Sequence, residues 1–381
     1  MTEQAKVPAI RFAGFTDPWE QRKLGDVASS FDYGLNAAAT EYDGQNKYLR
    51  ITDIDDETHE FSKSDLTTPL ADLAMSADYL LKESDLLFAR TGASVGKTYL
   101  YRQFDGMVYF AGFLIRARIG EGADPEFAYQ ATLTDAYKKY VAITSQRSGQ
   151  PGVNAQEYAD YQLMLPSKTE QQQIGMTLRS LDDLITLHQR KYDKLVIFKK
   201  SMLEKMFPKD GEPVPEIRFA GFTDPWEQRK FSDIVDVCSG KDYKHLEEGP
   251  IPVYGTGGFM TSVDEALSYD RDAVGIGRKG TIDKPYLLKA PFWTVDTLFY
   301  AIPKSDMDLE FVHCSFLNVD WKSKDESTGL PSLSKEAINE TIALVPSFNE
   351  QSRLGEFFSD LDSLITLHQR KLELLQNIKK S

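Results

Sequence analysis

A long internal duplication constrains the fold of this chain more than any other feature. The segment Ile10 to Lys23, IRFAGFTDPWEQRK, recurs letter for letter from Ile217 to Lys230, an offset of 207 residues. From Gly149 onward the matching residues lie 180 apart, so the second copy is 27 residues shorter in its middle. The chain is therefore a tandem repeat, and we expect both copies to fold on one plan.

A second duplicated stretch predicts one long helix in each copy, over residues 167–207 and 347–381. Ser167 and Ser347 stand three residues before Glu170 and Glu350, the spacing of a capping box. Apolar residues then follow at alternating steps of four and three, which is typical of a coiled-coil seam. The seam residues are Ile174, Leu178, Leu181, Ile185, His188, Tyr192 and Leu195 in the first helix, and Leu354, Phe358, Leu361, Ile365, His368, Leu372 and Leu375 in the second.

The order of the segments predicts that the two helices run antiparallel. A domain precedes each helix, and the linker PKDGEPVPE, residues 208–216, leads from the first helix into the second copy. Such a helix is about 50 Å long at 1.5 Å per residue. The first helix continues through MLEKMF, residues 202–207, whereas the second stops at Ser381, so we expect the second helix to be the shorter one.

The two middles differ in sequence but have similar layouts, which predicts an α+β fold with two similar domains, residues 1–166 and 217–346. In the first domain we expect strands at 48–54, 85–88 and 107–119 and a helix at 126–144. In the second we expect strands at 251–254, 273–276 and 292–302 and a helix near 309–321. Duplicated segments on both sides of divergent middle regions suit a protein whose two domains recognise two different targets.

Composition narrows the class of protein. The 381 residues are 41% hydrophobic, enough for two or three domains with their own cores. No signal peptide or membrane span is expected, and the separate Cys238 and Cys314 suit a reducing cytoplasm. The net charge of −14 disfavours diffuse attraction to nucleic acid, so any DNA contact must be local or shared with a basic partner.

The duplicated IRFAGFTDPWEQRK motif, the paired helices with LITLHQRK and the divergent middles resemble the specificity subunits of type I restriction–modification systems, over nearly the whole chain. The resemblance implies two target-recognition domains held apart by two antiparallel helices, each domain reading one half of a split site in double-stranded DNA. It also implies no catalytic centre and no cofactor of its own. Two methyltransferase (modification) subunits and restriction/translocase subunits would bring the chemistry. Similar members usually extend beyond the position of Ser381.

Two glycine-rich basic loops are candidate DNA contacts. Residues 92–98, GASVGKT, are one residue short of a P-loop, and an extended stretch follows them, so ATP binding is disfavoured. This loop and residues 277–280, GRKG, fit either DNA-contacting turns or ordinary solvated turns. The candidate DNA-binding residues are Arg50, Arg90, Lys97, Arg147 and Gln150 in the first domain, and Lys241, Thr256, Arg278, Lys279, Lys284 and Lys324 in the second.

Catalytic and metal-binding motifs are weak in this sequence. Asp17-Pro18-Trp19 lacks the second proline of an aminomethyltransferase loop, and Asp320-Trp321-Lys322 lacks the partner aspartate of a nuclease. His188 and His368 lie on the seam without further ligands, so we expect packing roles rather than metal binding. The sequence thus predicts a noncatalytic DNA-recognition subunit. The alternative is a protein-interaction scaffold that uses the same helices to bind two proteins.

Overall fold

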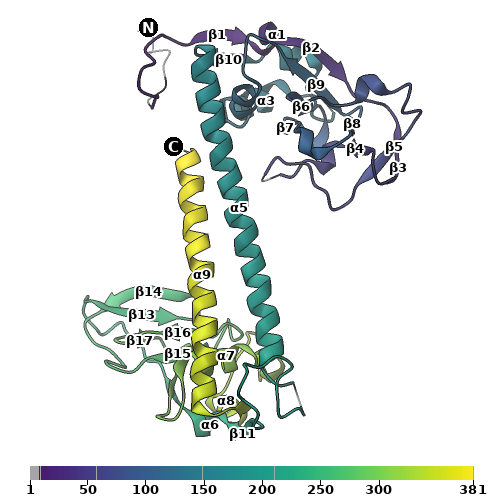
Figure 1. Ribbon diagram of the computed structural model, residues 1–381. Coiled ribbons are helices and arrows are strands. Elements are labelled where there is room, and N and C mark those ends of the chain that lie inside the picture. Colours follow the sequence, from purple (N-terminus) through teal and green to yellow (C-terminus); the bar gives the residue numbers. More distant parts are fainter. Residues whose placement is uncertain (1–7, 9, 57, 148, 210, 381) are drawn as a thin grey trace. The chain divides into compact units, whose positions relative to one another are not determined.

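A computed structural model describes residues 8, 10–56, 58–147, 149–209 and 211–380, and its ribbon is drawn in Figure 1. Ser381 of the expected second helix and Asp210 of the expected linker lie outside these residues. The chain forms two compact units, Met1–Leu187 with Leu375–Ser381 and His188–Leu374. Each unit contains one of the two similar domains together with parts of both long helices.

The first domain is built on a four-stranded antiparallel sheet in the order β2-β9-β6-β7. Two smaller pairs flank it, β3 with β5 antiparallel and β4 with β8 parallel. Short helices cover the sheet, and Phe88, Tyr137 and Tyr158 pack between the layers without solvent exposure above 2%. The elements are β1 (Glu20–Lys23), α1 (Leu24–Val27), β2 (Ala28–Tyr33), β3 (Ala38–Glu41), β4 (Lys47–Leu49), β5 (Thr67–Leu70), β6 (Asp85–Ala89), β7 (Thr98–Leu100), β8 (Val108–Phe110), β9 (Leu114–Ile119), α2 (Pro125–Ala131), α3 (Asp135–Thr144), α4 (Ala155–Ala159) and β10 (Gln162–Leu165).

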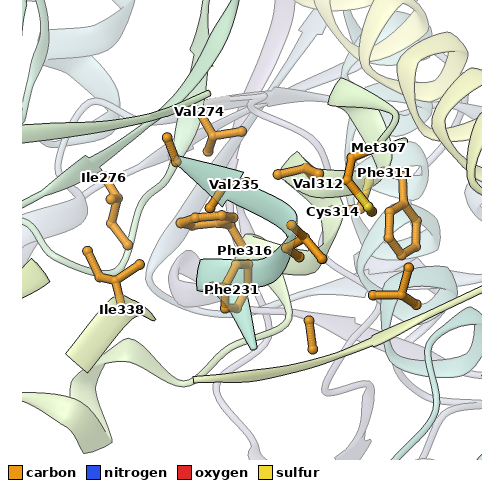
Figure 2. Close-up of a cluster of buried hydrophobic side chains, with 14 of the residues drawn as sticks. Phe231, Val235, Val274, Ile276, Met307, Phe311, Val312, Cys314, Phe316 and Ile338 are labelled. Atoms are coloured by element: carbon orange, nitrogen blue, oxygen red, sulfur yellow. The ribbon is translucent and has the colours of Figure 1, made fainter. Parts of the chain in front are cut away.

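The second domain repeats this plan, with a sheet in the order β12-β18-β15-β16 and a smaller sheet β14-β13-β17. Its core gathers aromatic and branched side chains from the sheet and from the helices that cover it, including Phe231, Phe316 and Ile338 (Figure 2). The prediction of two similar α+β domains is therefore confirmed. The elements are β11 (Glu227–Lys230), α6 (Phe231–Ile234), β12 (Val235–Ser239), β13 (Ile251–Gly255), β14 (Gly258–Val263), β15 (Ala273–Gly277), β16 (Tyr286–Leu288), β17 (Trp293–Thr294), β18 (Leu298–Pro303), α7 (Leu309–Leu317), α8 (Lys335–Glu340) and β19 (Ile342–Val345).

The exact sequence repeat closes each domain onto the start of its long helix. Strand β1 pairs with β10 immediately before the first helix, and β11 pairs with β19 in the same way. The Arg11 guanidinium donates from Nε and Nη2 to the buried Glu170 carboxylate at 2.6 and 2.7 Å, and Arg218 does the same to Glu350 at 2.7 Å for both bonds. Bidentate pairs of this kind fix orientation as well as position.

These ion pairs correct the capping-box prediction. The Glu170 amide does donate to the Ser167 hydroxyl, at 3.4 Å, but the Glu170 carboxylate faces Arg11 rather than the helix start. The next residue also acts outside the helix, because Gln171 accepts from the Asp124 amide at the start of α2. The spacing of Ser and Glu looked like a local motif, whereas the carboxylate serves a long-range contact.

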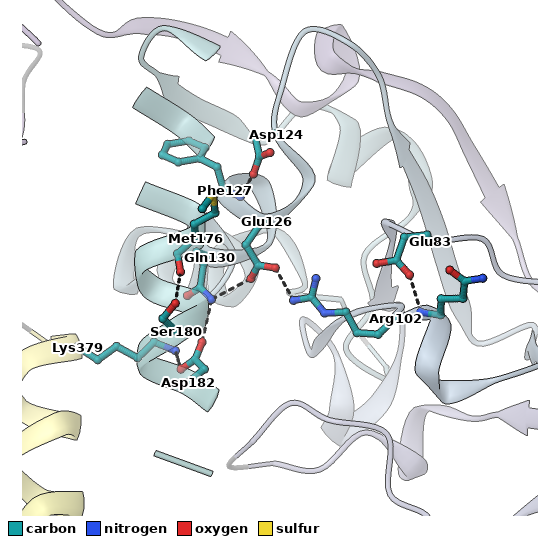
Figure 3. Close-up of polar contacts among 11 residues, drawn as sticks. Glu83, Arg102, Asp124, Glu126, Phe127, Gln130, Met176, Ser180, Asp182 and Lys379 are labelled. Atoms are coloured by element: carbon teal, nitrogen blue, oxygen red, sulfur yellow. Dashed lines mark hydrogen bonds and ion pairs between the residues drawn. The ribbon is translucent and has the colours of Figure 1, made fainter. Parts of the chain in front are cut away.

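The long helices are α5 (Lys168–Met206) and α9 (Phe348–Lys380). Within the second unit, His188 faces His368 and Lys199 pairs with Asp362. Residue numbers therefore decrease along α9 in the direction in which they increase along α5. Within the first unit, Asp182 pairs with Lys379, as Figure 3 shows. The helices are therefore antiparallel, as predicted. All fourteen expected seam residues are buried or partly buried, while the neighbouring Leu184, Leu187, Leu364 and Leu367 are 43–46% exposed.

Several predicted elements in the first domain are wrong in extent. The strand expected at 48–54 ends at Leu49, because the Asp53 carboxylate accepts the Arg50 amide and a 3-10 turn follows. The strand expected at 107–119 is broken at 111–113, where a tight turn separates β8 from β9. The helix expected at 126–144 is two helices, because Thr134 begins the second one by accepting the Tyr137 amide.

Corresponding breaks occur in the second domain. The strand expected at 292–302 is interrupted at 295–297, where the Leu298 amide donates to the Val295 carbonyl. The helix expected near 309–321 ends at Leu317, and a separate 3-10 turn at Trp321–Lys324 is capped by Asp320. In both domains the interrupted strand thus carries a turn at the same place in the sheet.

Candidate nucleic-acid interface

Four loops converge in each domain, and most of the backbone hydrogen bonds that join them correspond between the two domains. In the first domain they are residues 34–35, 90–92, 111–113 and 151–153, here called the first loop cluster. In the second they are residues 240–241, 278–280, 295–297 and 331–333, the second loop cluster. The Arg90 amide donates to Phe113 and its carbonyl accepts from Val153, just as the Arg278 amide donates to Thr297 and its carbonyl accepts from Leu333.

Glycines make this convergence possible. A Cβ added to Gly34 would lie 2.1 Å from the Ala111 carbonyl oxygen, and one added to Gly240 would lie 2.0 Å from that of Val295. Gly92 and Gly280 have φ values of 72° and 88°, a region that favours glycine, and each donates its amide to a proline carbonyl, at 151 and 331. The two clusters therefore share these glycine positions and the hydrogen bonds to proline, although most of their side chains differ.

Two of the five candidates in the first domain lie at the first loop cluster. The Arg90 guanidinium lies 5.0 Å from the centre of the Tyr33 ring, and Gln150 Nε2 lies 2.9 Å from the position a Cβ on Gly92 would take. Stacking of this kind holds the arginine without using its hydrogen-bond donors. Arg90 and Gln150 thus keep groups that can face a ligand.

The other three candidates of the first domain are held by carboxylates. Arg50 donates two bonds to Asp53, at 2.9 and 2.8 Å, and Arg147 pairs with Glu157. Lys97 Nζ lies 2.5 Å from Asp56 Oδ1 and donates to the Ile54 carbonyl. An ion-paired guanidinium has fewer donors left for a base, so these residues are weaker candidates than Arg90.

In the second domain Lys241, Arg278 and Lys279 lie together on the second loop cluster. The Lys241 amide donates to Thr294, and the amides of Arg278 and Lys279 both donate to Thr297, so one turn of the sheet positions all three. All three residues are exposed, and the Arg278 guanidinium lies 5.8 Å from the Phe299 ring centre. The second loop cluster therefore carries more of the candidate cations than the first.

The remaining candidates of the second domain lie outside the residues that form the second loop cluster. Thr256 directly follows β13, whose Tyr254 carbonyl accepts the amide of Val295 in the second loop cluster. Lys284 and Lys324 belong to two segments joined by an ion pair of 2.7 Å between Asp283 and Lys322. The structure therefore brings Lys284 and Lys324 into one neighbourhood through that pair.

Exposed apolar side chains near the clusters were missed by the sequence analysis. Phe113 in the first loop cluster is 58% exposed, and Leu330 beside the second is 66% exposed. Phe259 and Met260, at the tip of the β13–β14 hairpin, are 64% and 52% exposed. The signal that could have revealed Phe113 is its place after Gly112, since an aromatic residue in a glycine turn has little core to join.

The motifs considered for catalysis have structural roles. Residues 92–94 form a 3-10 turn and strand β7 follows at Thr98, so the P-loop geometry is absent there. Trp19 packs edge-on against Phe127, with ring centres 5.9 Å apart, and Trp321 is buried. Burial raises the pKa of the Cys314 thiol, which makes that group inert.

Neither metal-ligand clusters nor membrane-spanning helices occur in the described part of the chain. No group of three or more His, Cys, Asp or Glu residues there could hold a metal ion. None of the helices within residues 10–56, 58–147, 149–209 and 211–380 is long and apolar enough to cross a bilayer.

Comparisons with known proteins agree on one family. The model of the type I restriction modification DNA specificity domain matches residues 16–196 and 223–377. The specificity subunit of the type I restriction enzyme MjaVIII from Methanocaldococcus jannaschii is 21% identical, and the alignment covers 96% of this chain and 91% of that one. The putative MjaX specificity subunit of the same organism is 20% identical with the same coverage.

A solved structure also shares the fold. The type I restriction–modification S subunit from M. genitalium superimposes with a TM-score of 0.71 at 16% identity, covering 98% of this chain and 96% of that one. The family model alone matches well over half of the sequence, in two copies that coincide with the two repeats. The chain belongs to the family of type I restriction–modification DNA specificity domains.

Proposed function

We propose that this chain is the noncatalytic subunit that recognises DNA in a type I restriction–modification complex in the cytoplasm, and that it reads a split, asymmetric site. The observation that carries the proposal is the pair of loop clusters, which share most of their backbone hydrogen bonds and present different side chains. Two loop clusters with similar backbones but different side chains suit the recognition of two different half-sites. We also propose that the two domains that recognise DNA span residues 1–166 and 217–346.

The chemistry of each cluster supports contact with base edges. Arg90 and Arg278 can each donate two bonds to guanine O6 and N7, and Gln150 can pair with adenine. Lys241 and Lys279 add positive charge for phosphates beside them. Since the whole chain carries a net charge of −14, these local cations and a basic partner would have to supply the attraction to DNA.

Partner binding is the second part of the proposal. Leu184 and Leu187 on α5 recur as Leu364 and Leu367 on α9, 180 residues apart, and all four are 43–46% exposed. Two methyltransferase subunits could each meet an equivalent surface of this kind, and restriction subunits would join through the complex. The duplicated segments at 10–23 and 217–230, here called the frame motifs, are less available for partner binding, because Arg11 and Arg218 pair with Glu170 and Glu350.

Selection from a random-site DNA library, with the chain assembled with its methyltransferase subunits, tests DNA recognition. Arg278→Ala should relax the preference at one position of one half-site, a loss of about 1–3 kcal/mol in binding, and leave the other half unchanged. Lys289→Ala is the matched control, because that exposed lysine pairs with Asp272 away from the second loop cluster. No enrichment of any DNA would favour the alternative, a scaffold that binds only proteins.

A further inference from the structure

The hairpin formed by β13 and β14 in the second domain ends in an exposed apolar tip. Strand β14 is the edge strand of the smaller sheet β14-β13-β17 (Figure 1). The last pair of the hairpin ladder joins Gly255 to Gly258, so residues 256–257 form the turn. Phe259 and Met260 follow directly, and they are 64% and 52% exposed. Two large apolar side chains therefore lie at the end of a two-stranded ribbon.

These two side chains cover different faces of the tip. The Phe259 ring lies edge-on to the Tyr254 ring, with ring centres 6.3 Å apart and 77° between their planes. Met260 Sδ lies 2.6 Å from the position that a Cβ on Gly255 would take. Because neighbouring residues of a strand face opposite sides of the sheet, the partners of Phe259 and Met260 lie on opposite faces. The tip is thus apolar on both sides.

The tip is joined to the second loop cluster. The Tyr254 carbonyl accepts the Val295 amide at 3.0 Å. Val295 Cγ2 also lies 3.5 Å from the Cβ position on Gly255 that Met260 Sδ approaches. On strand β16, the Tyr286 hydroxyl donates to the Gly255 carbonyl at 2.7 Å and holds the end of the hairpin. A ligand that contacts the second loop cluster can therefore reach the tip.

The charges around the tip suit DNA. Residues 249–263 contain no Asp, Glu, Lys or Arg, although 27% of the chain is charged. No carboxylate of this segment would therefore repel a phosphate, while Lys241 and Arg278 of the second loop cluster are exposed. A Cβ added to Gly257 or Gly258 would meet nothing within 4 Å, so the turn has open space around it. These cations favour DNA over a protein as the occupant.

The corresponding place in the first domain is built differently. Strand β4 pairs parallel with β8, as β13 pairs with β17, so β4 and β13 correspond. After β4 the chain enters the 3-10 turn Ile51–Asp53, which the Arg50–Asp53 ion pair closes at 2.8 Å. The apolar tip is therefore one of the features in which the two domains differ.

We propose that the β13–β14 hairpin enters the minor groove and that Phe259, with Met260 on the other face, inserts between two base pairs and unstacks them. Phe and Met are among the side chains that act as such wedges, and a wedge kinks the duplex by about 20–90°. Pyrimidine–purine steps unstack most easily, so the tip would add a preference for such a step without a hydrogen bond to a base. This inference rests on the proposed function.

The chain assembled with its methyltransferase subunits, on DNA selected from the random-site library, tests the wedge. 2-Aminopurine placed at successive positions becomes more fluorescent where a base loses its stacking. We expect a rise at a pyrimidine–purine step in or beside the half-site whose preference Arg278→Ala relaxes. Phe259→Ala should abolish this rise and weaken binding about tenfold, within the range of base–aromatic stacking. Phe259→Leu should keep the rise, because leucine also acts as a wedge.

Tyr269→Ala is the matched control and should change neither fluorescence nor binding. Tyr269 is also 64% exposed, but it lies before the start of β15, whereas Arg278 follows the end of that strand. A partner subunit that flips its target base also raises fluorescence, and that signal should persist in Phe259→Ala.

The outcomes separate the wedge from the proposed function. A wild-type signal of which no part is lost in Phe259→Ala would overturn the wedge alone. Failure of Phe259→Ala to assemble with the methyltransferase subunits would also overturn it, and would assign the tip to a protein contact. If the wild-type complex enriches no DNA, the proposed function fails together with the wedge.

Discussion

Single residues of the duplicated segments have roles that can be tested one at a time. Gly355 lies in the first turns of α9, where an added Cβ would come within 2.4 Å of Asp308 Oδ1. That oxygen accepts the Phe311 amide at 2.9 Å and begins α7, so it has little freedom to move. The equivalent distance at Gly175 is 3.0 Å, to Asp124 Oδ1.

Gly355→Ala should therefore destabilise the second domain. The overpacking cost of about 1–3 kcal/mol should exceed the gain of about 1 kcal/mol in helix propensity. Gly175→Ala should cost less, because its neighbours need to move only by tenths of an ångström. Urea unfolding measures both, and Gly329→Ala is the control, since nothing lies within 4 Å of its added Cβ. Equal effects of all three substitutions would contradict this account.

The histidine pair of the seam predicts a pH dependence. His188 Nδ1 lies 2.8 Å from His368 Nδ1, and burial, then the charge of His368, lowers the pKa of His188. Lys371 and Lys191 act in the same direction. Because the folded pKa is below the ordinary value of 6.5, the unfolded chain binds the proton more readily, and stability should fall as pH drops below about 6.5.

Calorimetric melting between pH 8 and 5 would measure this loss against the double variant His188→Leu, His368→Leu. Burial also lowers the pKa of His313 to about 4, so part of the acid sensitivity comes from that side chain. The double variant retains His313, and the difference between the two melting profiles isolates the seam pair. Parallel profiles would show that the pair does not titrate with unfolding.

At the scale of elements, the seam should respond unequally in its two halves. Leu361 is 6% exposed in the core of the second unit, whereas Leu181 in the first is only partly buried. Leu361→Asp should cost about 2–5 kcal/mol for the lost apolar side chain and more for the buried charge. Leu181→Asp should cost less stability. Thermal melts measure both variants, with the exposed Leu364→Asp as the control. Equal melting temperatures for all three variants would contradict the proposed seam.

The sequence predicted the elements best where their pattern is long and local. The heptad spacing continues through seven seam residues in each helix, and α5 and α9 begin within a residue of their expected starts. It failed where a polar contact interrupts an apolar run. Residues 107–119 and 292–302 look like single strands, yet both break at turns set by the amides of Leu114 and Leu298. Those breaks are parts of the two loop clusters, so the misread positions coincide with the candidate site.

The candidate site itself could be predicted only in part, for a physical reason. Glycine and basic residues mark the loops 92–98 and 277–280, and Arg90, Arg278 and Lys279 do lie on the clusters. The partners that neutralise Arg50, Lys97 and Arg147 are carboxylates whose proximity depends on the folded backbone. Tyr33 and Gly34 meet the cluster from 56 or more residues away, which no local pattern encodes.

At the scale of the whole molecule, we expect recognition of two short unlike sequences separated by a gap of indifferent bases. Helices of 39 and 33 residues correspond to about 58 and 50 Å. With about 3.4 Å per base pair, we propose half-site centres on the order of 10 to 15 base pairs apart. Because the loop clusters carry different side chains, the site should not be a palindrome.

Exchange of parts tests this expectation in cells that carry the complete restriction–modification system. Replacing residues 24–166 with the same region of another family member should change one half-site and leave the other half and the gap unchanged. That exchange keeps the frame motif at 10–23, with the Arg11–Glu170 pair that closes the domain on α5. Inserting two heptads into both α5 and α9 should instead widen the gap and keep both halves, since helix length would set the spacing. Genome-wide methylation mapping reads out both variants, and a continuous or palindromic motif in either would contradict two separate readers.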